Sequence, residues 1–377
     1  MNILRRFSLF LVLLLSVVAV YAGGIGNVKE LMAFAKAVNS GADLSEWKDE
    51  KGVVCLEGDI DMKKAKKLPV IVAFTGVFDG KGYALKNWRA KDAFIHELKE
   101  GSEVRNLRID ASCSMKVTSG SEPFVRGFIV NINNGTLRNC ENYGSIEHRA
   151  DATTAHIHIG GLCGRNRYIL IDCKNGGKIT SEVVVASPKK VGLFVGGLAG
   201  CSYKNLKCAS YIRCENSGDI TVKSDMPETF VGGITGQSVY ASLKHCVNRG
   251  GVDVTTLKGA EKVGGRVYMG GVVGHANNNI ICCDNFSKVD SKGVYQVRMA
   301  GIVGMPNGKF NITGCTNYGK VVSAQPDRQF STEFAPGLVG QIDRQRGVLC
   351  KHTQCYRSVK PSGGIVQRLV SAVIVNA

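Results

Sequence analysis

The sequence predicts an all-β chain wound into a parallel β-helix, with three short strands in each coil and one capping helix at its N-terminal end. Three observations lead to this prediction. A strand phrase recurs along the chain, a cysteine–asparagine phrase recurs between its copies, and no window between them has helical periodicity. A repeat of this kind is typical of stacked coils, in which each coil contacts only its neighbours.

The strand phrase is a small residue and glycine, two mostly apolar residues, and a further glycine. A degenerate copy at 126–130 begins the array. The full copies are found at 160–164, 196–200, 232–236, 270–274, 300–304 and 336–340. Each copy is bounded by glycine, asparagine or aspartate, which are typical of turns between short strands.

The second phrase is Cys-x-Asn-x-Gly, and its cysteines are separated by 33, 41, 32, 37, 32 and 40 residues. They are Cys140, Cys173, Cys214, Cys246, Cys283, Cys315 and Cys355, the last of which has lost its asparagine. Stacked coils place equivalent residues about 4.8 Å apart, with parallel Cα–Cβ directions. Disulfides need converging Cβ atoms, so we expect a ladder of buried thiols that pack as small apolar groups.

The asparagines of this phrase are expected to form a second ladder, with each side-chain amide bonded to the next coil and to the backbone. The glycine that follows is expected to adopt a positive φ.

The ends of the chain differ from the repeats. Residues 1–22 have Arg5 and Arg6, an apolar run and a small-x-small sequence ending at Ala22, as in a cleaved signal peptide. Residues 23–123 are expected to form the cap and lead-in coils, with a helix at 28–38 whose apolar residues recur at helical spacing. Residues 124–361 then form the seven-repeat array, and residues 362–377 form a terminal strand or cap.

The chain is basic. The full sequence has a net charge of +17, and removing residues 1–22 takes away two arginines and no acidic residue, leaving +15. An excess of this size favours polyanionic partners, among which an acidic polysaccharide fits an exported protein better than nucleic acid. The alternative is that lysine and arginine keep a long β surface soluble and its edges unpaired. No transmembrane segment is predicted after the leader.

At these residues the chain resembles extracellular repeat proteins that carry the GLUG motif, which occur in exported proteins of Bacteroidetes and in parts of bacterial adhesins and immunoglobulin-A proteases. The lead-in is also similar to theirs, notably at 34–39, 59–62 and 74–80. The resemblance covers roughly residues 27–356. It implies a right-handed parallel β-helix at the cell surface or in the medium, and it supplies no catalytic residue.

One candidate binding stripe precedes the glycines. The residues two positions before the strand phrase are mostly aromatic, and in a parallel stack they form one column, which Arg266 and Arg298 accompany. If this column faces outward, it offers a platform for sugar rings, and if it faces inward it is an aromatic core stack. Its members are His158, Phe194, Phe230, Tyr268, Arg298 and Phe334.

Other polar residues give weaker signals. His156 and His158 alternate with isoleucines, so both are expected on one strand face as a solvated pair rather than as metal ligands. Asp59 and Asp61 resemble the paired carboxylates of glycosidases, but a turn-stabilising role is favoured for them and for Asp79. Among the acidic residues, Asp219 and Asp253 come closest to occupying equivalent positions in successive repeats. No cofactor motif is present.

These features favour an exported, non-catalytic repeat protein that presents a basic β surface for adhesion or glycan binding. The alternative is a polysaccharide lyase or glycoside hydrolase that acts on an acidic glycan, and a third possibility is a structural spacer.

Overall fold

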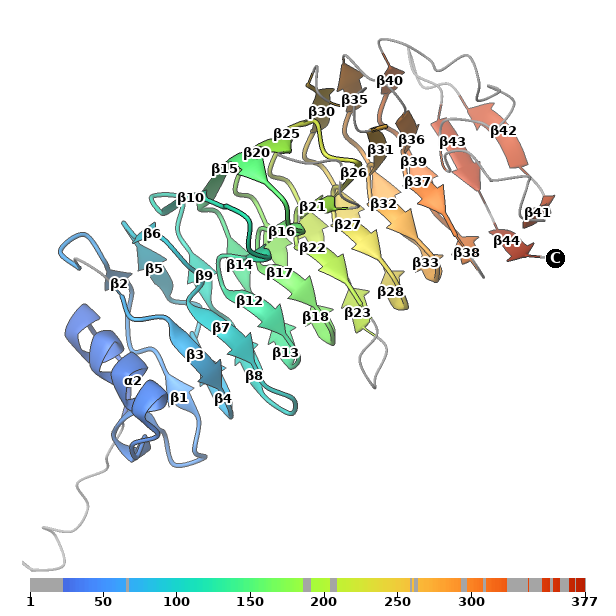
Figure 1. Cartoon of the computed structure of the whole chain (residues 1–377). Coiled ribbons are helices and arrows are strands. Elements are labelled where there is room, and N and C mark those ends of the chain that lie inside the picture. The colour runs from blue at the N-terminus through green and yellow to red at the C-terminus, as the bar shows by residue number, and fades with distance from the viewer. Residues whose placement is uncertain are drawn as a thin grey trace, which may run out of the picture.

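The chain winds into a parallel β-solenoid, as the repeats predict (Figure 1). The computed structural model describes residues 23–65, 68–185, 191–203, 209–257, 260, 264–292, 297–307, 310–323 and 338, and the strands between 348 and 376. The predicted signal peptide and Phe334 lie outside the described residues. Strands that are far apart in sequence lie side by side in five sheets, which we number in the order in which a full coil visits them.

Among the described residues, sheet 1 begins at residue 124, where the degenerate repeat begins. Its six parallel strands are β11 (Phe124–Arg126), β16 (Ile157–Gly160), β21 (Gly192–Gly196), β26 (Glu228–Gly232), β31 (Arg266–Gly270) and β36 (Val297–Ala300).

Sheet 2 follows each strand of sheet 1 after the glycine pair. Its strands are β3 (Ile71–Phe74), β7 (Ile95–Leu98), β12 (Val130–Asn133), β17 (Cys163–Asn166), β22 (Ala199–Ser202), β27 (Thr235–Ser238), β32 (Val273–Ala276) and β37 (Val303–Pro306).

Sheet 3 leads into the cysteine phrase. Its parallel strands are β1 (Val54–Cys55), β4 (Val77–Asp79), β8 (Glu103–Arg105), β13 (Thr136–Arg138), β18 (Ile169–Ile171), β23 (Ala209–Ile212), β28 (Ala241–Lys244), β33 (Asn279–Ile281) and β38 (Phe310–Thr313).

Sheet 4 contains the asparagines of the cysteine phrase. Its parallel strands are β2 (Ile60–Asp61), β5 (Ala84–Lys86), β9 (Arg108–Ile109), β14 (Glu141–Asn142), β19 (Lys174–Asn175), β24 (Glu215–Asn216), β29 (Val247–Asn248), β34 (Asp284–Asn285) and β39 (Thr316–Asn317).

Sheet 5 closes the coil. Its strands are β6 (Arg89–Ala90), β10 (Ser114–Thr118), β15 (Ser145–Thr153), β20 (Ile179–Val185), β25 (Ile220–Ser224), β30 (Val252–Thr256), β35 (Val289–Lys292) and β40 (Val321–Ser323). A full coil therefore has five strand segments rather than three. The first expected segment is split by the glycine pair, and the Cys-x-Asn phrase contributes a short strand of its own.

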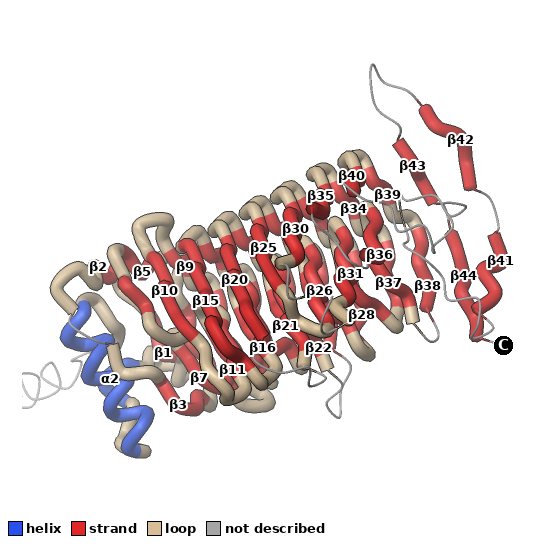
Figure 2. Tube along the Cα trace, turned by 45° about the horizontal axis from the view of Figure 1, so that its top comes forward, coloured by secondary structure: helices blue, strands red, loops and turns tan. Residues whose placement is uncertain are grey.

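A helix covers the N-terminal end of the stack, as predicted (Figures 1 and 2). Helix α2 (Val28–Ser40) begins after Asn27, whose side chain accepts hydrogen bonds from two backbone N–H groups, and it ends at Gly41 with φ 69°. Asn39 donates to Val70 O and accepts from Val72 N, both at 2.8 Å. This one side chain therefore occupies hydrogen-bonding groups at the exposed edge of β3. A short 3-10 helix, η1 (Ser45–Trp47), follows.

The C-terminal strands end the parallel stacking. β44 (Ser371–Asn376) and β43 (Val366–Leu369) run antiparallel to β38 and β39, and β41 (Val348–His352) and β42 (Cys355–Val359) pair outside them. The expected seventh copy at Cys355 is therefore not in register, because β43 separates its strand from β39. Arg357 stands where the earlier copies have asparagine, so this copy lacks the amide that would continue the ladder.

The asparagine ladder is confirmed and is fully buried over most of its length. Each Nδ2 donates to a backbone carbonyl two residues ahead, and in all but the last member, Asn317, it also donates at 2.8 Å to the Oδ1 of the next coil. The amide groups in the middle of the column therefore both donate and accept hydrogen bonds, which is the condition for burying a polar side chain at low cost. The ladder consists of Asn142, Asn175, Asn216, Asn248, Asn285 and Asn317.

The thiol ladder is confirmed for the six copies in register. Cys140, Cys173, Cys214, Cys246, Cys283 and Cys315 are all buried and free. In all of them but Cys283, Sγ approaches a carbonyl oxygen of the preceding coil, for example Cys173 to Leu137 O at 3.4 Å. Burial raises the pKa of the Cys173, Cys246 and Cys283 thiols well above the usual value, which keeps them protonated and unreactive.

The expectation of a positive φ after the ladder asparagines is wrong. The left-handed residue instead lies just before each ladder cysteine, as at Asp172 (φ 56°) and Arg213 (φ 51°). The glycine after the asparagine is required by close packing, because a Cβ at Gly218 would lie 2.1 Å from Gly177 O in the coil below. The glycine therefore allows consecutive coils to approach, not a special backbone angle.

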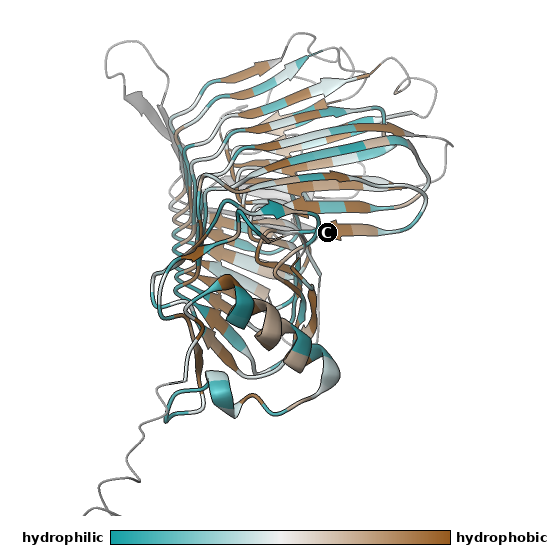
Figure 3. Ribbon diagram, turned by 90° about the vertical axis from the view of Figure 1, so that its left-hand side faces the viewer, coloured by the Kyte–Doolittle hydropathy of each residue, from teal (hydrophilic) through white to brown (hydrophobic). Residues whose placement is uncertain are grey.

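The two repeat phrases meet inside the molecule. A Cβ at Gly233 would lie 2.1 Å from Gly271 O and 2.3 Å from Cγ of Asn248, and Gly161, Gly197 and Gly271 approach their own ladder asparagines equally closely. The glycine pair between sheets 1 and 2 thus packs against the asparagine ladder of sheet 4. Figure 3, seen from the helix end, shows the coils superimposed behind one another, which is how this contact repeats in each coil.

Candidate functional site

The predicted aromatic stripe is a continuous column of stacked rings on sheet 1. His158 stacks on Phe194 with ring centroids 4.6 Å apart, Phe194 on Phe230 at 4.9 Å, and Phe230 on Tyr268 at 4.9 Å. The Arg298 guanidinium lies 5.8 Å from the Tyr268 centroid. Each ring therefore uses its faces to contact the rings of neighbouring coils.

This column points away from the main core, yet it is buried. His158 is 1% exposed, and the three rings that follow are each 4% exposed. The outer faces of sheets 1 and 2 converge at the glycine pair, so the column packs against the outward side chains of sheet 2. Phe230 and His275, for example, have centroids 5.7 Å apart, and Arg298 Nη1 lies 3.3 Å from Met305 Sδ. We call this region the inner corner.

The inner corner decides between the two interpretations of the stripe. The column belongs to a small cluster of its own, Phe194, Phe230, Tyr268 and Cys201, separate from the main core. Since the ring faces contact each other and the rings are covered, a sugar cannot stack on them. The expectation of an outward aromatic platform is therefore wrong for His158, Phe194, Phe230 and Tyr268.

The cationic members of the stripe lie closer to solvent. Arg266 is exposed on β31 and pairs in register with Glu228 of β26, while Arg298 is half-buried above Tyr268. Both therefore place positive charge near the surface of the inner corner.

The expected solvated histidine pair is only half correct. His156 is exposed, and its Nδ1 accepts a hydrogen bond from Gly192 N at 3.0 Å. His158, by contrast, is buried, and its Nδ1 has no hydrogen-bond partner among the described residues. Sequence alternation placed both on one face but could not show that sheet 2 covers the second. Among the described residues no three potential ligands group as a metal site.

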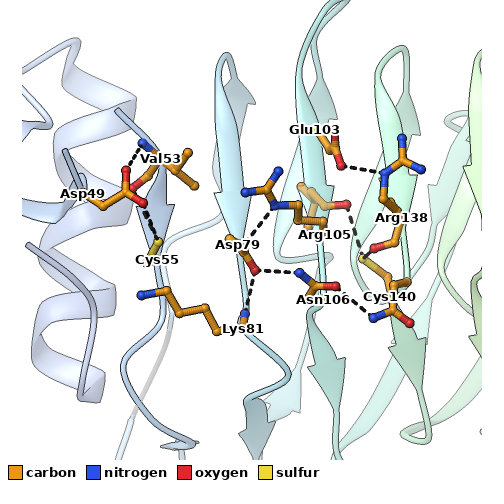
Figure 4. A network of polar contacts seen from close by, with 12 residues as sticks. Asp49, Val53, Cys55, Asp79, Lys81, Glu103, Arg105, Asn106, Arg138 and Cys140 are labelled. Atoms are coloured by element: carbon orange, nitrogen blue, oxygen red, sulfur yellow. Dashed lines mark hydrogen bonds and ion pairs between the residues drawn. The ribbon is translucent and has the colours of Figure 1, made fainter. Parts of the chain in front are cut away.

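The acidic residues weighed as catalysts hold turns and cross-coil contacts instead. Asp59 accepts from Ala84 N at 2.7 Å, and Asp61 accepts from Lys63 N at 2.8 Å. Asp79 accepts from Lys81 N at 2.8 Å and pairs with Arg105 at 2.8 Å (Figure 4). The turn-stabilising interpretation is thus confirmed for Asp61 and Asp79, whereas Asp59 bonds the next coil rather than its own turn.

The pKa of the Asp79 carboxyl reflects these hydrogen bonds. Burial alone would raise it, but hydrogen bonds from Asn106, the Lys81 backbone and Arg105 outweigh burial and hold it below the usual value. Such a carboxylate is stabilised in its charged form and is poorly suited to donate a proton at neutral pH.

Cross-coil ion pairs extend over the faces of sheets 3, 4 and 5. Examples are Glu103 with Arg138 (Figure 4), Asp172 with Arg213, and Asp253 with Lys292. In the coils from β13 to β40, strands of these sheets hold six basic and eight acidic residues. Strands of sheets 1 and 2 in the coils that begin at β11 hold four arginines, no lysine and one acidic residue, Glu228.

An exposed aromatic group on another corner was missed by the sequence analysis. Phe286 and Tyr318, 41% and 47% exposed, stack at 4.5 Å, and the Arg249 guanidinium lies 4.5 Å from the Phe286 centroid. These residues follow the ladder asparagines directly, so the repeat register could have identified the column. Both faces of Phe286 are covered, leaving only its edge to solvent.

Comparisons with known proteins inform the fold. No protein-family model and no curated protein matches the chain. Among solved structures, a candidate immunoglobulin A1 protease from Bacteroides ovatus is similar, with a TM-score of 0.52 and 16% sequence identity, over 80% of this chain and 84% of that chain. At this identity the likeness shows the fold alone, a parallel β-solenoid. No helix in the described part of the chain is long and apolar enough to cross a membrane.

Proposed function

We propose that this chain is an exported, non-catalytic repeat protein that binds an acidic glycan of a cell surface through the outer face of sheets 1 and 2. The observation that carries the proposal is the uneven distribution of charge. Three sheets have acidic and basic residues in near balance, whereas the strands of sheets 1 and 2 carry an excess of arginine.

The choice of arginine supports an anionic ligand. Its planar guanidinium forms paired hydrogen bonds with carboxylate or sulfate groups, and it is less strongly hydrated than the ammonium of lysine. A rigid stack of coils would hold such groups at regular intervals, which suits a linear polymer with one charge per sugar or per disaccharide. The signal-peptide pattern of residues 1–22 and the resemblance to the GLUG-motif proteins support export.

Binding to immobilised acidic and neutral polysaccharides tests the proposal. A variant with Arg165, Arg266 and Arg298 all changed to glutamine should lose most of its binding to the acidic polymer. The matched control changes Arg138, Lys223 and Lys244 to glutamine, which removes the same charge from sheets 3 and 5.

We expect the control to bind nearly as well as the unmodified protein, with binding that weakens as salt increases. Equal loss in both variants would show that only net charge matters, and no binding by the unmodified protein would refute the proposal. New reducing ends or unsaturated sugars in the same incubations would replace it with a hydrolase or lyase.

A further inference from the structure

Polar side chains gather at one level of the inner corner, around β16 and β17. The rings of His156 and His158 have centroids 6.4 Å apart, and the Tyr203 ring lies edge-on to His158 at 6.2 Å. Arg165 projects from the outer face of β17 and is half-buried, as are Arg167 and Tyr203, while His156 is exposed. We call these five residues the His158–Arg165 cluster.

Two atoms of this cluster are buried without a hydrogen-bond partner among the described residues. They are Nδ1 of His158 and Nε of Arg165. Leaving a buried polar atom unpaired costs about 1–3 kcal/mol. Most such atoms in folded proteins have partners, so two neighbouring exceptions need an explanation.

Packing does not explain the histidine. The next two coils have Phe194 and Phe230 at the same position, stacked in the same geometry, so phenylalanine fits the column and would remove the unpaired nitrogen. Nor does packing require Arg165, because the same column of sheet 2 contains Cys201 and Gln237 in the next two coils. The chain therefore has His158 and Arg165 at positions where the next two coils show that uncharged residues also fit.

The groups that converge here are cationic or can donate hydrogen bonds. Arg165 and Arg167 carry guanidinium groups, Tyr203 has a hydroxyl, and a neutral His158 can donate from Nδ1. Burial, together with the charges of Arg165 and His156, holds the pKa of His158 well below its usual value, so the ring is neutral at physiological pH. Glu228 is an acidic residue close enough to act on Tyr203.

We propose that the His158–Arg165 cluster is a subsite for one oxyanion group of an acidic sugar, in which the half-buried Arg165 turns outward to pair with the anion and His158 Nδ1–H, covered in the ligand-free chain, becomes a second donor to it. The shared chemistry of the ligand is a singly charged carboxylate or sulfate group on a pyranose ring. This inference rests on the proposed function, and it adds that one level of the face is selective while the other arginines attract the polymer by charge.

Two single variants with the same change in charge test the subsite. Arg165→Gln places in β17 the residue that its column has at Gln237, and Arg266→Gln removes an exposed arginine of the same face. Affinities are measured for a uronate oligosaccharide, a sulfated oligosaccharide and a neutral oligosaccharide of equal length. We expect Arg165→Gln to weaken binding of one anionic oligosaccharide about 10-fold or more, as for a lost charge-assisted hydrogen bond, and Arg266→Gln to weaken it less than about 3-fold.

His158→Phe supplies the second test, since phenylalanine at this position matches the next two coils and should preserve the fold. We expect it to weaken the same oligosaccharide about 5-fold or more while leaving the neutral one unchanged. Which of the two anionic oligosaccharides responds identifies the oxyanion as carboxylate or sulfate.

The failure of the subsite and the failure of the proposed function give different results. Equal weakening by Arg165→Gln and Arg266→Gln, with full binding by His158→Phe, would overturn the subsite and leave the face as a general polyanion surface. No binding of either anionic oligosaccharide by the unmodified protein would overturn the proposed function and the subsite with it.

Discussion

Two side-chain columns run the length of the repeat coils and differ in what they repeat. The ladder on sheet 4 has asparagine in all six coils, and each interior amide both donates to and accepts from its neighbours. The outer column of sheet 1 changes from His158 through Phe194, Phe230 and Tyr268 to Arg298. The first column is uniform because each coil faces the same packing problem. The second varies because its positions are not needed to close the coil.

The largest effect is expected where the uniform column meets the glycine pair. Gly233→Ala would place a Cβ 2.1 Å from Gly271 O and 2.3 Å from Asn248 Cγ. Neither atom can retreat without disturbing a backbone bond between coils or the ladder itself. We expect a loss of about 4–5 kcal/mol in the free energy of unfolding or a failure to fold.

Urea unfolding monitored by circular dichroism measures this loss. Gly58→Ala is the control, because a Cβ at Gly58 meets nothing within 4 Å. A Gly233→Ala protein as stable as the Gly58→Ala control would show that the glycine pair is not required by the asparagine ladder.

A smaller loss is expected from interrupting the ladder in the middle. Asn216→Leu removes the bonds from Nδ2 to Gly218 O and to Asn248 Oδ1, and it leaves the amide of Asn175 without its acceptor in the next coil. We expect a destabilisation of about 3 kcal/mol, since a buried donor then loses its partner.

Asn142→Leu tests whether the destabilisation comes from breaking the ladder between coils or only from removing one polar side chain. Asn142 donates to Gly144 O and Asn175 Oδ1 but stands at the first position of the ladder, so its removal strands no amide from a coil below. Its effect on the urea midpoint should be smaller than that of Asn216→Leu, and the reverse order would contradict the coupling between coils.

The uniform columns could be predicted from sequence because the same residue returns at the same position. Cysteine and asparagine recur at the positions of Cys173 and Asn175 in successive repeats, which predicts the two ladders, and parallel stacking then fixes the spacing between coils. The contact between Gly161 and Asn175 could not be predicted in this way. It joins two phrases in different sheets, and only the path of the coil brings them together.

The candidate site was harder to predict for a related reason. His158 and Arg165 were on strands whose positions could be assigned, but the glycine pair between them bends the chain so that the outer faces of sheets 1 and 2 meet. Alternation along a strand gives the side of the sheet, and it does not tell whether another sheet covers that side. The loss of register at Cys355 was visible as a missing asparagine, yet the insertion of the antiparallel strand β43 between β39 and β42 was not.

A pH-dependent effect should distinguish the inner corner from the ladders. In the inner corner, burial with the charge of Arg298 nearby lowers the pKa of His275 from 6.5 to about 4, and on β15 of sheet 5 burial with Arg126 nearby lowers that of His148 to about 4. Between pH 6.5 and 4, these two histidines therefore bind protons in the unfolded chain but stay neutral in the folded chain. Stability falls with decreasing pH across this window and is unaffected by these groups above it.

At pH 5 each histidine should reduce the free energy of unfolding by about 2 kcal/mol relative to pH 8, at about 1.4 kcal/mol per pKa unit. His275→Met, which introduces the residue of the next coil, should remove one such contribution. Thermal unfolding of both proteins at pH 8 and pH 5 measures the difference. Identical pH dependence would contradict a neutral, buried His275, and the aspartates with lowered pKa values are present in both proteins and so cancel in the comparison.

The smallest expected effect is the stability that the ligand-free protein loses by having a histidine, kept for function, in the outer column of sheet 1. His158→Phe makes the position match Phe194 and Phe230, keeps the stacked ring and removes an unpaired buried nitrogen. We therefore expect the ligand-free variant to gain about 1 kcal/mol of stability, measured by thermal unfolding at pH 8, where the histidine is neutral in both states. Phe194→His is the converse variant and should lose a similar amount, because it places a second unpaired ring nitrogen in the same column. If His158→Phe is destabilised instead, Nδ1 has a partner within the protein, and the position is then part of the scaffold rather than a polar group held in reserve for a ligand.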